Sequence, residues 1–67
     1  MSQALADIKS AFEERGIPTT LYIIDTANNR LMIDAEFLGI VRRYPVWEPL
    51  ETAFTQSCGT ITTFGAK

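Results

Sequence analysis

The sequence contains no histidine and only one cysteine, Cys58. Without an imidazole the chain has no Ser-His-Asp or Cys-His catalytic set and no histidine-containing zinc site. A single thiol can form neither an internal disulfide nor a four-cysteine zinc site. Small secreted domains normally carry several disulfides, so the cysteine usage favours a reducing, cytoplasmic setting. We expect Cys58 to be a small buried side chain with a structural role.

The sequence also lacks glycine-rich loops, long apolar runs and an excess of basic charge. Its four glycines stand singly, so neither common type of phosphate-binding glycine loop is present. No apolar run approaches the ~20 residues that cross a membrane. Six basic against eight acidic residues give a net charge of −2, whereas a dedicated nucleic-acid domain usually has a strong basic excess. We therefore expect no enzymatic activity, no cofactor, no metal site and no membrane partner.

The pattern of apolar and turn residues predicts a single domain over residues 1–67 with mixed secondary structure. The predicted segments are a helix over 2–15, strands over 19–25 and 30–34, a short helix or strand over 34–44, a helix over 49–57 and a strand over 60–64. The order α-β-β-(α)-α-β predicts the α+β class. We expect a small two-layer domain whose three-stranded, mainly antiparallel sheet carries helices on one face.

Capping residues, glycines and prolines indicate where several of these segments begin or end. Ser2 is a suitable N-cap for the first helix. Gly16 fits the left-handed position that ends a helix, and Pro18 prevents continuation. Over 34–44, a helix capped by Asp34 competes with a strand. Two prolines bound the later segment PVWEP, which predicts an extended stretch and a helix that begins at Pro49.

The strand over 19–25 is apolar on both faces, which predicts a central position in the sheet or a face that packs on a partner. For a chain this short, apolar burial and the entropy of ordering are each on the order of 100 kcal/mol and nearly cancel. The monomer is therefore expected to be marginally stable. Tyr22, Ile24 and Met32 would form an open apolar sheet face, so we expect a homodimer that pairs through this face or an edge strand.

The segment Arg42-Arg43-Tyr44-Pro45-Val46-Trp47 is the strongest candidate for a binding surface. Arg, Tyr and Trp are enriched at interface hot spots, and a proline-stiffened segment loses little entropy on binding. The predicted partner-binding residues are Arg42, Arg43, Tyr44 and Trp47. Two structural alternatives remain open: Trp47 can belong to the core, and the arginines can interact with the end of a helix.

Three functional hypotheses follow from these features. The first is a small non-enzymatic interaction module, a regulator, inhibitor or adaptor that occupies a surface of a larger protein partner. The second is a dimeric regulator that binds nucleic acid through Arg42, Arg43 and Tyr44, with an aromatic side chain stacked on bases. The third is a structural subunit of a homo-oligomer.

Overall fold

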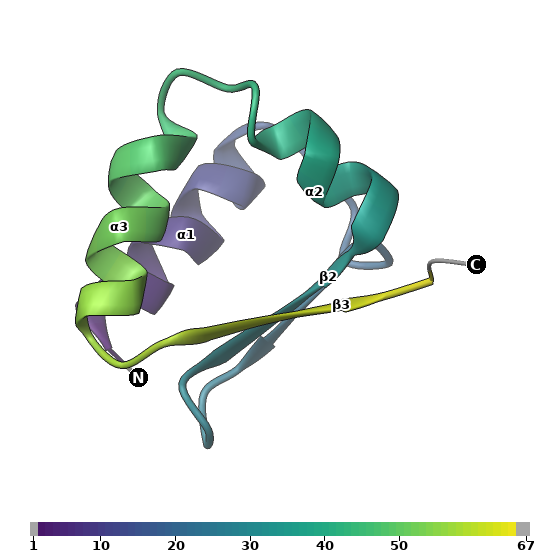
Figure 1. Ribbon diagram of the computed structural model, residues 1–67. Coiled ribbons are helices and arrows are strands. Elements are labelled where there is room, and N and C mark those ends of the chain that lie inside the picture. Colours follow the sequence, from purple (N-terminus) through teal and green to yellow (C-terminus); the bar gives the residue numbers. More distant parts are fainter. Residues whose placement is uncertain (1, 66–67) are drawn as a thin grey trace.

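Three helices cover one face of a three-stranded sheet in the computed structural model, which describes residues 2–65 (Figure 1). The predicted α+β class and two-layer arrangement are confirmed. The elements in chain order are α1 (Gln3–Glu14), β1 (Tyr22–Asp25), β2 (Arg30–Asp34), α2 (Ala35–Val41), α3 (Trp47–Gln56) and β3 (Thr60–Phe64).

The sheet has the order β1-β2-β3 and is mixed rather than mainly antiparallel. β1 pairs antiparallel with β2, from Tyr22 opposite Ile33 to Asp25 opposite Arg30. β3 pairs parallel with β2 because the chain leaves β2, passes through α2 and α3 and re-enters the sheet in the same direction. Of the two alternatives for the first strand, the central position was wrong, since β2 holds that position.

Local side-chain and backbone contacts fix both ends of α1. The Ser2 hydroxyl accepts a hydrogen bond from the Leu5 backbone N–H at 3.2 Å, as expected of an N-cap. At the other end Gly16 has φ +66, and its N–H donates to the Glu13 carbonyl. The Ile17 N–H donates to the Phe12 carbonyl, which completes a Schellman motif with Gly16 in the predicted left-handed position.

The ambiguous segment after β2 is a helix. The Asp34 carboxylate caps α2 by accepting a hydrogen bond from the Phe37 N–H at 3.0 Å. The helix ends at Val41 and buries one apolar face against the sheet. Arg42 is the C-cap residue and Arg43 follows it, so the two cations lie just beyond the helix rather than in its last turn.

α3 begins at Trp47, two positions before the predicted start at Pro49. Pro45 and Val46 form a turn, and the Trp47 N–H donates to the Tyr44 carbonyl at 3.1 Å. The segment is therefore not extended. Pro49 fits inside the first turn of α3 because N–H groups there have no partner within the helix, so the missing donor costs nothing.

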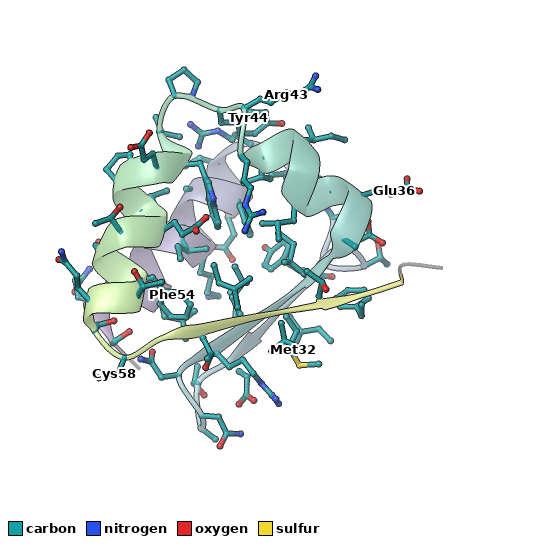
Figure 2. The ribbon with its side chains drawn as sticks, viewed as in Figure 1. Met32, Glu36, Arg43, Tyr44, Phe54 and Cys58 are labelled. Carbon is teal, nitrogen blue, oxygen red and sulfur yellow. The ribbon has the colours of Figure 1, made fainter. Side chains whose placement is uncertain are left out.

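The end of α3 places Cys58, not glycine, in a left-handed conformation with φ +65. The Cys58 N–H donates to the Thr55 carbonyl and the Gly59 N–H to the Phe54 carbonyl. The Cys58 side chain is exposed, which contradicts the expectation that it is buried (Figure 2). Gly59 instead lies so close to the Phe54 ring that a Cβ at this position would overlap the ring.

The core lies between the sheet and the helices. Its buried residues are Leu5, Ile8, Phe12, Tyr22, Leu31, Ile33, Phe37, Leu38, Val41, Trp47 and Phe54. Tyr22 and Ile24 contribute to this inner side, because their register partners Ile33 and Leu31 face the helices.

The predicted self-association set is therefore wrong in part. Tyr22 is 4% exposed and Ile24 packs against the core, so neither lies on an open face. Of the three predicted residues, Met32 alone points away from the helices (Figure 2). Its cross-strand neighbour is Ile23, which is 51% exposed. The two apolar faces of β1 were assigned in reverse because hydrophobicity alone did not distinguish them.

Candidate functional site

The turn between α2 and α3 carries the predicted partner-binding residues. Arg42 and Arg43 are exposed, Tyr44 is half-buried, and Trp47 is buried. Figure 2 shows Arg43 pointing away from the body of the molecule, with Tyr44 beside it at the base of the turn. The structure thus brings three of the four predicted residues to the surface together.

Trp47 belongs to the core and is not available to a partner. Its side chain is 3% exposed, and its indole ring stacks on the Phe12 ring. The indole N–H donates to Glu51 Oε1 at 2.6 Å, which satisfies the one polar group of the ring. The open alternative from the sequence is therefore settled in favour of the core, and Trp47 is removed from the candidate set.

Arg15 is a third cation at this surface. Its guanidinium carbon lies 6.0 Å from the centroid of the Tyr44 ring, within the range of a cation–π contact. Arg15 Nη1 also donates to the Ala11 carbonyl at 2.9 Å. Nothing in the sequence links Arg15 to Tyr44, because the contact arises only when the end of α1 packs beside the turn.

The two adjacent arginines differ in their surroundings. Arg42 Nε lies 3.7 Å from Glu51 Oε1, the same oxygen that accepts the Trp47 hydrogen bond. An exposed pair of this kind contributes ~0–1 kcal/mol, but it restricts where the Arg42 side chain points. Within residues 2–65, Arg43 forms no ion pair. Arg43 is thus the more accessible charge of the two.

Two exposed aliphatic side chains flank the arginines. Ile40 is 53% exposed and Val46 is 41% exposed; with Ile23 they are the large exposed hydrophobic residues of the described chain. The Arg43 N–H donates to the Ile40 carbonyl at 3.0 Å, so the two residues lie one turn apart on the same side. We call this surface the α2–α3 patch, formed by Arg15, Ile40, Arg42, Arg43, Tyr44 and Val46.

A shallow depression of about 280 Å³ borders the patch along α3. It is lined by Arg42, Trp47, Glu48, Glu51, Thr52 and Thr55. Both signs of charge meet there, which suits a polar contact at the rim of an interface rather than a cavity for one small charged ligand. Among the described residues, no three acidic or cysteine side chains gather in a way that could hold a metal ion.

The hairpin turn holds a separate charged cluster with a structural role. The Asp25 carboxylate accepts hydrogen bonds from the backbone N–H and the side-chain amide of Asn28, at 3.2 and 3.0 Å. Arg30 Nη2 lies 3.0 Å from the same carboxylate. The Asn28 side chain, and then the Asn28 N–H and Arg30, hold the pKa of Asp25 below its usual value of 3.8. This arrangement closes the hairpin turn, which is a structural role for the cluster.

Comparison with protein-family models, with curated proteins and with solved structures finds no significant match to this chain. In residues 2–65, the helices are too short or too polar to cross a membrane. The composition and geometry of the α2–α3 patch are therefore the features that bear on function.

Proposed function

We propose that this protein is a non-enzymatic interaction module that binds a larger protein partner through the α2–α3 patch. The observation that carries the proposal is that one short stretch, residues 40–46, exposes two aliphatic side chains and two arginines, and that its half-buried Tyr44 lies against Arg15. Tyrosine and arginine are over-represented among interface residues whose loss costs most binding energy. Flanking aliphatic groups would supply the apolar contact and exclude water from the charged contacts.

The patch is held in one conformation before a partner arrives. The Tyr44 N–H donates to the Val41 carbonyl at 2.9 Å, and the Trp47 N–H donates to the Tyr44 carbonyl. Pro45 fixes one backbone angle in the turn. The buried Trp47 ties the far end of the turn to the core. Such a surface loses little conformational entropy on binding, which favours its use as an interface.

The chemistry of the patch points to a partner surface that combines an apolar contact with one or more carboxylates. Among the described residues the Arg43 guanidinium has no ion-pair partner, and a guanidinium can bind a carboxylate through two parallel hydrogen bonds. A phosphate backbone fits less well, because Ile40 and Val46 have no apolar counterpart on it and Glu51 already partly neutralises Arg42. We therefore favour a protein partner over a nucleic acid.

Affinity capture from the source cell with matched variants tests the proposal. Arg43→Ala and Ile40→Ala should each lose a protein that the parent captures, while melting temperatures move by no more than about 2 °C, since both side chains are exposed. Lys9→Ala removes an exposed cation from α1, and Ile23→Ala removes an exposed aliphatic side chain from β1. Both controls should capture the same protein as the parent.

Two results would overturn this function. If the Arg43→Ala and Ile40→Ala variants capture every protein that the parent does, the α2–α3 patch is not the binding surface. If the parent binds random duplex or single-stranded DNA at micromolar concentration, with steep loss on added salt and loss in Arg43→Ala, the surface is a nucleic-acid site.

A further inference from the structure

The outer edge of β3 has none of the features that normally protect an edge strand. β3 lies at one side of the sheet, in the foreground of Figure 1. Its sequence TITTF has no charged residue and no proline, and its five residues pair with β2 in unbroken register. Natural proteins usually protect such an edge with lysine, proline or a bulge, because its free backbone groups can pair with another strand.

The hydrogen-bond pattern identifies the free groups. The Thr60 N–H donates to the Asn29 carbonyl at 3.2 Å, so the backbone of Thr60 points toward β2. Backbone groups alternate along a parallel strand, so those of Thr62 and Phe64 point the same way. The N–H and carbonyl groups of Ile61 and Thr63 therefore point outward. In residues 2–65, neither residue forms a hydrogen bond with a segment outside the sheet.

We propose that β3 pairs antiparallel with β3 of a second copy of this chain, about a twofold axis at Thr62. In this register Ile61 lies opposite the partner's Thr63, and Thr63 lies opposite the partner's Ile61. The outward backbone groups of each such pair exchange two hydrogen bonds. The two three-stranded sheets then form one continuous sheet, and the α2–α3 patch does not take part.

The side chains on this edge are complementary to themselves, which favours a second copy over another strand. Thr62 faces the partner's Thr62 at a position without backbone hydrogen bonds, where side chains come closest, and Thr–Thr pairs across strands are favourable. Phe64 faces the partner's Thr60 on the same side of the sheet. Because β3 has no charge, the pairing brings no like charges together.

The pairing also extends the rows of side chains that cross the neighbouring strands. Thr62 is the register partner of Met32, and Met32 is the register partner of Ile23. The twofold axis therefore places the row Ile23–Met32–Thr62 end to end with the same row of the partner, on the sheet face that carries no helices. Contacts limited to one strand pair bury less surface area than a standard protein–protein interface does, so we expect a dissociation constant in the micromolar range.

Thr63→Pro should disrupt hydrogen bonding at the outer edge of β3 without affecting hydrogen bonding at its inner edge, where it pairs with β2. Proline at this position removes an N–H that points away from β2, so the β2–β3 pairing keeps its hydrogen bonds. Thr63→Val is the matched control, since it keeps the N–H and the branched side chain. In sedimentation experiments with reductant, from about 5 to about 500 µM, the parent and Thr63→Val should dimerise. Thr63→Pro should dimerise at least tenfold more weakly.

Amide hydrogen exchange on the parent gives a second readout that needs no variant. The amides of Ile61 and Thr63 should exchange more slowly at about 500 µM than at about 20 µM, whereas the Thr62 amide should be slow at both. A monomeric parent at about 500 µM overturns the proposal. So does a dimer in which the Ile61 and Thr63 amides gain no protection, or one that Thr63→Pro leaves intact, because a different surface then makes the contact.

Discussion

The indole ring of Trp47 lies nearly parallel to the ring of Phe12, with an angle of 8° between their planes and 5.9 Å between their centroids. The contact joins the start of α3 to the end of α1. Tyr22 and Phe37 pack edge-on against the same Phe12 ring, with centroid distances of 4.7 and 5.9 Å. Trp47 directly follows the turn that carries the α2–α3 patch, so the position of the patch depends on this core cluster.

Trp47→Ala should reduce the free energy of unfolding by about 3–5 kcal/mol, because it removes a large buried side chain and leaves a cavity next to Phe12. A domain of 67 residues has few kcal/mol in reserve, so we expect the variant to be largely unfolded by circular dichroism. The parent's tryptophan emission should be blue-shifted, as for a buried indole. Emission like that of free tryptophan in the folded parent would contradict this placement.

The features that the sequence predicted well are those set by neighbours in the chain. The Ser2 and Asp34 caps and the Gly16 helix end each depend on contacts within five residues, and all three are present. The exposure of Arg42 and Arg43 follows similarly from their position just after a helix.

The features that the sequence did not predict depend on contacts between distant segments. β1 is apolar on both faces, so only its pairing with β2 shows that Tyr22 faces the core. The parallel direction of β3 is set by the path of two helices, which no local pattern records. Arg15 contacts Tyr44 only because α1 packs beside the turn, so the sequence did not predict that Arg15 belongs to the patch.

Gly59→Ala should destabilise the protein by about 1–3 kcal/mol, because the new Cβ would overlap the buried ring of Phe54 and force it to move. Gly39→Ala is the matched control. A Cβ there meets nothing within 4 Å, and the position is inside α2, so this change should stabilise by about 0.5–1 kcal/mol. Urea unfolding of both variants measures the difference. Equal effects at the two sites would show that Phe54 does not contact Gly59.

Gly16→Ala should cost about 1 kcal/mol, because φ is +66 at this position and alanine resists the left-handed region. A Cβ at Gly16 meets no neighbour within 4 Å, so the loss would come from the backbone alone. Thermal unfolding provides the measurement. A melting temperature within about 1 °C of the parent would show that the helix end is not held as described.

Cys58→Gly tests a second left-handed position, where the substitution should stabilise the protein rather than destabilise it. Cys58 occupies the left-handed position at the end of α3 with φ +65, and its side chain is exposed. Glycine relieves the backbone strain and sacrifices little packing, so unfolding should cost about 1 kcal/mol more than in the parent. Cys58→Ser keeps the strain and serves as the control for the loss of the thiol. Stabilisation by Ser as large as that by Gly would assign the effect to the thiol.

The pH dependence of stability should report on the hairpin turn. Hydrogen bonds from Asn28, and the charge of Arg30, lower the pKa of Asp25 in the folded protein below the usual value of 3.8. A lowered folded pKa means that the ionised carboxylate stabilises the fold. This contribution is complete above the unfolded pKa and is lost as pH falls through the folded pKa.

Asp25→Asn should therefore be less stable than the parent at neutral pH, and this gap in stability between parent and variant should close below about pH 3.8. Urea midpoints from about pH 7 to about pH 2 measure the gap, with Glu36→Gln, which removes an exposed carboxylate from α2, as the control for net charge. A gap that stays constant down to the lowest pH would mean that Asp25 contributes by its shape rather than by its charge.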